Sequence, residues 1–176
     1  LGIGDDNGTK IYGVSGRVNN PGCWELPIGT KVADIIALAG GMQDGVKLRG
    51  FLPGGGSTDF LTQDHLDLAM DYGTIQQAGS RMGTGTMIIL DDRSCAVGMI
   101  ANLEKFFARE SCGFCTPCRE GLPWVQEVLD RIEAGNGELD DIEVLERQSQ
   151  FIGASGNTHC AHAPGAMEPP ASGLKY

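Results

Sequence analysis

The stretch Glu110-Ser111-Cys112-Gly113-Phe114-Cys115-Thr116-Pro117-Cys118-Arg119-Glu120-Gly121 places three cysteines at steps of three residues. Three thiols cannot all pair with one another, but a tight loop with glycine and proline can direct three sulfurs at one centre. This C-x2-C-x2-C spacing matches the start of a cysteine run that holds a [4Fe–4S] cluster, whose irons suit soft thiolate ligands. Cys160, or less often a histidine such as His159 or His162, would supply the fourth ligand.

Other metal chemistry is compatible with the same residues. The three cysteines with Cys160, His159 or His162 could form a structural zinc site, although zinc ligands usually come as two separated C-x2-4-C pairs. Reactive thiols are a third hypothesis, but a thioredoxin-like pair needs a βαβ context, and the residues before Cys112 are helical in pattern. The close spacing of the three cysteines therefore favours an iron–sulfur cluster. Cys23 and Cys95 stand alone and are expected to be small buried thiols.

The half of the chain that carries the motif has helical periodicity. Apolar stripes at helical spacing are formed by Val97, Ile100, Glu104 and Phe107, by Leu122, Val125, Leu129 and Ile132, and by Ile142, Leu145 and Ile152. Arg119, beside a ligand and near a helix start, could offset the negative charge of a bound cluster. Glu168-Pro169-Pro170 places two prolines where the last helix would be expected to begin. Three or four helices in about 80 residues predict a small bundle.

The first half has strand and turn patterns instead. Lys10–Val18 predicts a strand, a turn at 19–22 follows, and residues 23–26 return as its hairpin partner. Residues 31–39 predict a short helix capped by Thr30 and ended by Gly40-Gly41, and residues 47–52 and 87–90 predict two further strands. The fold class is therefore α+β, with a domain over residues 7–92 and a helical bundle over residues 93–176.

Composition excludes several classes of protein. The 176 residues carry a net charge of −10, which argues against binding to nucleic acid or to anionic lipid. No apolar run approaches the roughly 20 residues of a membrane span. The N-terminus has no basic start and no apolar segment of the signal-peptide type, so the six cysteines are expected to be thiols or metal ligands.

The chain resembles a known family along almost its whole length. The motif Glu110–Gly121 and the downstream Cys160-Ala-His-Ala-Pro-Gly-Ala166 resemble the NADH-binding flavoprotein subunit of bacterial complex I, NADH:quinone oxidoreductase. Ile11–Val18, Gly29–Met42 and Gly83-Thr-Gly85 resemble the β-grasp domain of that subunit, which is of the soluble-ligand-binding (SLBB) type. Diaphorase subunits of NAD-dependent formate dehydrogenases and of NAD(P)-reducing hydrogenases share the cysteine motif.

The resemblance implies a β-grasp domain followed by an iron–sulfur bundle, with Cys112, Cys115, Cys118 and Cys160 holding a [4Fe–4S] cluster. In the family, the cluster takes electrons from reduced FMN and passes them towards quinone. The FMN and NADH sites lie in an upstream domain whose glycine-rich loops are missing here. The chain is thus expected to be a soluble C-terminal fragment that does not oxidise NADH alone. Its implied partners are the upstream domain and neighbouring iron–sulfur subunits, in a peripheral arm on the cytoplasmic face of the inner membrane.

Overall fold

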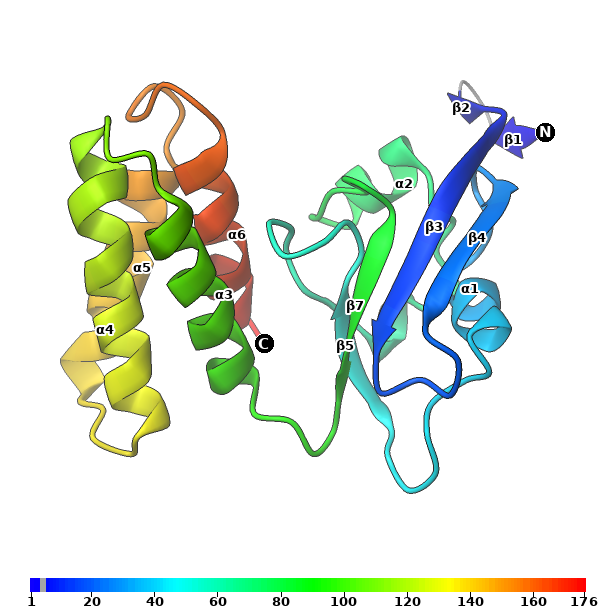
Figure 1. The fold of residues 1–176 in the computed structure, drawn as a ribbon, viewed down its shortest axis with the longest axis horizontal. Helices are drawn as coiled ribbons and strands as arrows, with labels where there is room; N and C mark the ends of the chain where they lie inside the picture. Colours follow the sequence, from blue (N-terminus) through cyan, green and yellow to red (C-terminus); the bar gives the residue numbers. More distant parts are fainter. Residues whose placement is uncertain (4–5) are drawn as a thin grey trace. The chain divides into compact units, whose positions relative to one another are not determined.

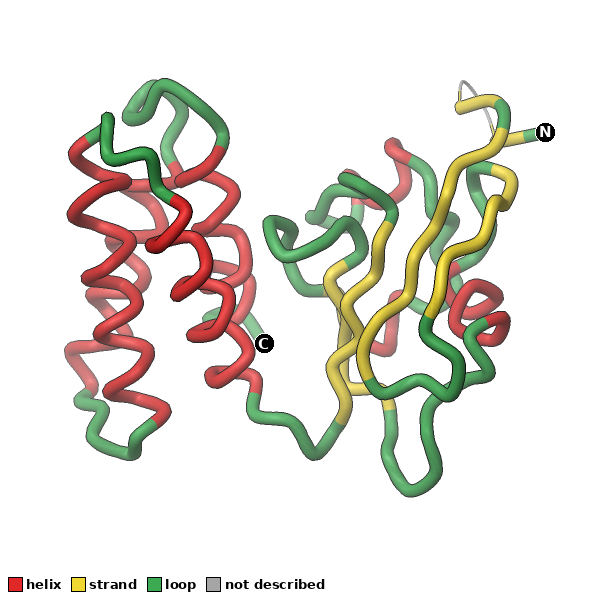
Figure 2. Tube along the Cα trace, in the orientation of Figure 1, coloured by secondary structure: helices red, strands yellow, loops and turns green. Residues whose placement is uncertain are grey.

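The computed structural model describes residues 1–3 and 6–176, which divide into two compact units, Leu1–Arg93 and Ser94–Tyr176. Strands with short helices make up the first unit, and helices make up the second (Figures 1 and 2). The predicted α+β class is confirmed by this content. Among the described residues, no helix is both long enough and apolar enough to cross a membrane.

The first unit is built on a five-stranded sheet in the order β4-β3-β7-β5-β6. Its strands are β3 (Thr9–Gly16), β4 (Gly22–Pro27), β5 (Leu48–Leu52), β6 (Leu61–Thr62) and β7 (Thr86–Asp91). The predicted hairpin is present as β3 and β4, and β3 pairs in parallel with the central strand β7. Two short strands, β1 (Gly2–Ile3) and β2 (Asp6–Asn7), form a separate antiparallel pair. A sheet with a central parallel pair and hairpins outside it is the β-grasp arrangement that the resemblance implies.

Two helices cover one face of this sheet. They are α1 (Val32–Leu38) and α2 (Tyr72–Gln77), and a single turn η1 (Gln63–His65) precedes α2. Tyr12 of β3, Phe51 of β5 and Met87 of β7 share one buried cluster with Ile35 and Ile75 of the two helices. Since alternate strand residues point to opposite faces, this shared cluster places both helices on the same side of the sheet.

The ends of α1 give one correct prediction and one error. Gly40 and Gly41 follow the helix with φ of 76° and 72°, a conformation that favours glycine, as predicted. The predicted Thr30 cap is wrong, because Lys31 occupies the N-cap position without a side-chain hydrogen bond. The Thr30 hydroxyl instead donates to the carbonyl of Pro27 at 2.7 Å.

The helices of the second unit pack as an antiparallel bundle (Figure 1). They are α3 (Ala96–Glu110), α4 (Leu122–Glu133), α5 (Leu139–Gly153) and α6 (His162–Gly173), with a π-helical turn η2 (Pro117–Gly121) before α4. The predicted stripes are largely buried, although Ile142 remains about half exposed. Up-and-down packing brings the α3–α4 and α5–α6 connections to the same end of the bundle (Figure 2).

The start of the last helix differs from the expectation. α6 begins at His162, well before the two prolines, and contains Pro169 and Pro170 within its length. Each proline removes one intrahelical N–H donor. The hydroxyl of Ser172 donates to the carbonyls of Glu168 and Pro169, which adds hydrogen bonds in this weakened turn.

Candidate metal centre

The first cysteine loop forms where α3 ends. Ser111 leaves helical geometry with φ −59° and ψ 130°, and Gly113 turns the chain with φ +77°, a value that favours glycine. The chain then re-enters helical geometry through η2. Cys112 and Cys115 therefore lie in the loop, and Cys118 lies in the π-helical turn. Such single π turns are frequent at functional sites.

The second cysteine loop joins α5 to α6 and carries Cys160 two residues before α6 begins. Because both loops lie at the same end of the bundle, the sulfurs can meet despite their separation in sequence (Figure 1). Cys112, Cys115, Cys118 and Cys160 all line one cavity of about 190 Å³. Glu110, Thr158, His162 and Ala163 complete its wall. The structure thus brings together all four cysteines singled out from the sequence.

Among the described residues, two hydrogen bonds reach the sulfurs of this cavity. The hydroxyl oxygen of Ser111 lies 3.0 Å from Cys118 Sγ. The backbone N–H of His159 donates to Cys115 Sγ at 3.4 Å. Donors of this kind stabilise negative charge on a ligating sulfur. Each loop therefore contributes one polar group that contacts a sulfur of the centre.

Arg119 acts on the loop rather than directly on a sulfur. Its guanidinium donates from Nη1 to the carbonyl of Gly113 at 2.8 Å and from Nε to Glu120 at 2.9 Å. The first bond ties the end of the loop to its glycine turn. From the sequence, Arg119 could offset the charge of a bound cluster, and the structure shows in addition that Arg119 holds the loop through Gly113.

The two histidines near Cys160 have other contacts. Nε2 of His162 lies 2.8 Å from the carbonyl of Phe107, and its ring packs edge-on against that of Phe107. The His159 ring packs edge-on against Phe114. One nitrogen of His162 is therefore already engaged with the backbone of α3.

The cavity fits a polynuclear iron–sulfur group. Its volume is several times the roughly 30 Å³ that one water occupies in the liquid. Four thiols are the donor set that such clusters take. Within residues 1–3 and 6–176, no three His, Cys, Asp or Glu side chains are grouped closely enough to hold one metal ion.

The two remaining cysteines correct another expectation. Cys23 and Cys95 are both exposed, not buried. Cys23 lies on β4, the outermost strand beside β3. Cys95 occupies the N-cap position of α3, where its sulfur accepts from the N–H of Gly98 and lies 2.9 Å from Glu133 Oε2. A capping position lies at the helix surface, which explains the exposure of Cys95.

One buried acidic group lies outside the cysteine cavity. Glu104 of α3 is fully buried, and neither of its carboxylate oxygens has a hydrogen-bond partner among the described residues. Desolvation raises the pKa of this carboxyl to about 8. The helical spacing places Glu104 on the apolar stripe, and its raised pKa favours the neutral acid in the bundle interior at pH 7.

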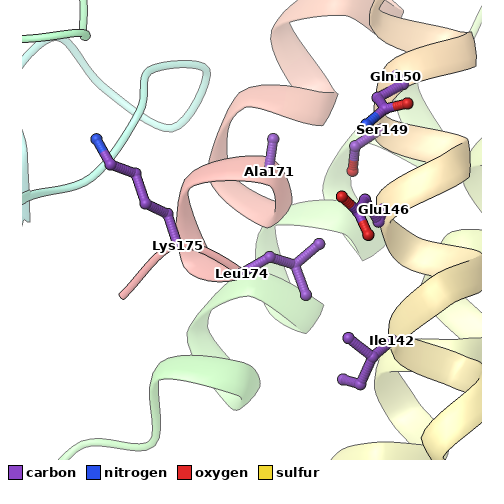
Figure 3. A pocket seen from close by; sticks show the side chains of 7 residues that line it. All are labelled: Ile142, Glu146, Ser149, Gln150, Ala171, Leu174 and Lys175. Atoms are coloured by element: carbon purple, nitrogen blue, oxygen red, sulfur yellow. The ribbon is translucent and has the colours of Figure 1, made fainter.

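The helical unit has other hollows that hold no cysteine. A cavity of about 390 Å³ lies between α5 and α6 (Figure 3). It is lined by Ile142, Glu146, Ser149, Gln150, Ala171, Leu174 and Lys175. A groove of about 370 Å³ beside η2 is flanked by the exposed rings of Trp124 and Phe151.

Family models match both units. Residues 98–176 match the NADH-ubiquinone oxidoreductase-F iron-sulfur binding region, and residues 11–60 match the SLBB domain. The first match confirms the prediction of a [4Fe–4S] cofactor, and the second confirms the predicted type of β-grasp domain.

Curated relatives carry a consistent name. The F-type chain of NADH-quinone oxidoreductase from Escherichia coli is 54% identical over 172 residues, which is 97% of this chain and 38% of that protein. The corresponding protein of Buchnera aphidicola from Acyrthosiphon pisum is 49% identical over the whole chain, which spans 40% of it. The chain therefore spans about two-fifths of the length of these relatives.

A solved structure has the same fold. An NAD⁺-reducing [NiFe]-hydrogenase in the H2-reduced state aligns over the whole chain with a TM-score of 0.86 and 28% identity. The chain covers 29% of that hydrogenase chain. The similarity therefore includes both units and extends to a hydrogenase, as the shared cysteine motif led us to expect.

Proposed function

Because the chain belongs to the family of F-type chains of NADH-quinone oxidoreductase, through its iron–sulfur binding region and its SLBB domain, we propose that it is the electron-transfer module of such an oxidoreductase. In this proposal Cys112, Cys115, Cys118 and Cys160 hold a [4Fe–4S] cluster. When bound, the cluster supplies a one-electron relay. The observation that carries the proposal is that one cavity is lined by four thiols from two segments far apart in the sequence.

The surrounding residues have defined tasks in this function. The four cysteines bind as thiolates, so each must lose its proton. Gly113 and Arg119 hold the first loop in shape, and the backbone N–H of His159 donates to Cys115. No acid–base residue is required for electron transfer, and we assign none.

Exposure at the site supports an exchange of electrons with partners. Cys112 and Cys160 are exposed, and the Phe114 ring between the first two cysteines is 73% exposed. A redox group in this cavity would therefore lie close to the protein surface. A donor and an acceptor could then approach it without any rearrangement of the bundle.

The names of the relatives support a proposal for the partners and for the place in the cell. We propose that reduced FMN, in an upstream domain that also binds NADH, delivers electrons to this module. Neighbouring iron–sulfur subunits would carry them towards quinone, in a peripheral arm at the cytoplasmic face of the inner membrane. A diaphorase module is a second candidate, favoured by the likeness to an NAD⁺-reducing [NiFe]-hydrogenase.

Metal analysis of the purified chain tests the proposal. After anaerobic reconstitution, we expect about four irons and four sulfides per chain, with an electron paramagnetic resonance signal in the dithionite-reduced sample. Serine in place of any one of the four cavity cysteines should lower the iron content. Cys23→Ser, an exposed cysteine of the other unit, is the matched control and should leave it unchanged. One zinc per chain, with no iron and no signal, would refute the proposal.

A further inference from the structure

The four cavity cysteines are not equivalent. Cys118 is 6% exposed, whereas Cys112 and Cys160 are exposed and Cys115 is intermediate. A buried anionic sulfur needs hydrogen bonds in place of the water that it has lost. Among the described residues, the hydroxyl of Ser111 lies within hydrogen-bond distance of Cys118 Sγ, at 3.0 Å. Ser111 precedes the first cysteine of the motif and belongs to no part of the ligand set.

The direction of this hydrogen bond follows from the neighbouring contacts. The backbone N–H of Gly113 donates to Ser111 Oγ at 3.3 Å, which occupies one acceptor position of the hydroxyl. A metal-bound cysteine is a thiolate and has no proton to donate. The hydroxyl proton of Ser111 is therefore the one available for the bond to Cys118 Sγ.

Ser111 is held in place for this role by the backbone. It ends α3 in a non-helical conformation, and the Gly113 N–H closes a short turn onto its hydroxyl. The other donor found for a cavity sulfur among the described residues is the backbone N–H of His159, on Cys115. The two donors act on different sulfurs and come from different loops. Substitution of Ser111 thus removes one of them alone.

We propose that Ser111 is a positioning residue whose hydroxyl, by donating to the buried sulfur of Cys118, raises the reduction potential of the iron–sulfur group. The inference rests on the proposed function, because it requires that Cys118 be a ligand. Hydrogen bonds to ligating sulfur withdraw negative charge and favour the reduced state, and they are one of the means by which proteins set the potential of such groups.

The test is a potential measurement on the full-length protein that carries this chain. The midpoint potential of the wild type, Ser111→Ala and Ser111→Thr is determined by redox titration followed by electron paramagnetic resonance. We expect Ser111→Ala to make reduction about tenfold less favourable, which for a one-electron couple is about 59 mV more negative. Ser111→Thr keeps the hydroxyl and should stay close to the wild type.

Thr116→Val is the matched control. Thr116 lies in the same loop, and its side chain makes no capping hydrogen bond to η2. Loss of this hydroxyl should leave the potential unchanged. An equal shift in Thr116→Val and Ser111→Ala would overturn the inference, because it would show a general response of the loop.

The possible outcomes separate this inference from the proposed function. A wild type without iron refutes the proposed function. A wild type with the cluster, and a Ser111→Ala variant with the same potential, overturns only the inference. If Ser111→Ala binds no iron, the result for Ser111→Thr tests the inference instead. Iron binding at the wild-type potential in Ser111→Thr supports the proposed role of the hydroxyl, and loss of either the iron or the potential overturns the inference.

Discussion

Replacement of Glu104 by glutamine should abolish a loss of stability that the wild type shows as the pH rises. The carboxyl of Glu104 is fully buried, has no partner for either oxygen among the described residues, and has its pKa raised from 4.5 to about 8 by desolvation. In the unfolded chain the same group ionises near its ordinary pKa. Glutamine has nearly the same shape and no ionisable proton.

The sign and size of the effect follow from linkage. Between pH 4.5 and about 8 the folded state keeps the proton of Glu104 and the unfolded state loses it. The free energy of unfolding therefore falls as the pH rises through this window and levels off above it. At about 1.4 kcal/mol per pKa unit, the shift corresponds to roughly 5 kcal/mol. Glu104→Gln should lack this slope.

The assay is urea unfolding at several pH values from about 5 to 8. A Trp24→Phe background leaves Trp124 of α4 as the fluorescent reporter of the helical unit. The wild-type midpoint should fall with rising pH, while that of Glu104→Gln should stay nearly level. Glu127→Gln, an exposed glutamate of α4, is the control and should follow the wild type.

Parallel curves would refute this reasoning. If Glu104→Gln lost stability with pH as steeply as the wild type, the buried carboxyl could not be the source of the slope. A steeper loss in Glu104→Gln than in Glu127→Gln would likewise place the titrating group elsewhere in the bundle.

Three further substitutions probe the cluster site and the sheet. Cys118→Ala should lower the iron content and destabilise the helical unit far more than the sheet unit, because metal binding contributes to folding. Variants with a single tryptophan report the unfolding of each unit separately, and an equal loss of stability in both units would contradict this prediction. Tyr12→Phe removes the buried hydrogen bond from the phenol to the Met70 carbonyl, which still accepts from the Gly29 N–H. The loss should therefore cost the sheet unit roughly 0.5–1.5 kcal/mol in urea unfolding, and an unchanged midpoint would show that the bond adds nothing. In Gly54→Ala the new Cβ would lie 2.5 Å from the Met82 carbonyl oxygen, so the sheet unit should be destabilised by about 1–3 kcal/mol. Calorimetry measures this loss, and an unchanged melting temperature of the sheet unit would rule out the close approach.

The elements that the sequence predicts well are those fixed by local patterns. The hairpin of β3 and β4 has a turn of Asn, Pro and Gly between two strand-like segments, and the bundle helices have clear apolar stripes. The sequence does not predict α2, because it is short, contains Gly73, and has one buried apolar residue, Ile75. Its stability comes from the Asp71 cap and from packing in the sheet core, neither of which has a periodic signal.

The candidate metal site could likewise be predicted only where a local pattern fixes it. The spacing of Cys112, Cys115 and Cys118 identifies the first three cysteines, because a short loop keeps them together. The approach of Cys160 depends on the up-and-down order of four helices, which the residues alone left open and the family resemblance supplied. The hydroxyl of Ser111 carries no sequence signal, because a serine before a cysteine is common and its value here depends on a turn at Gly113.

The meeting of two loops at one end of the bundle has a consequence for chain entropy. Cys160 follows Cys118 by 42 positions, so a group bound to both would act as a cross-link that closes a long loop. For a disulfide, closing a loop of this length removes roughly 4 kcal/mol of unfolded-state entropy. A bound group would thus link the segment between α5 and α6 to the segment that follows α3, and the bundle would depend on its redox centre for part of its stability.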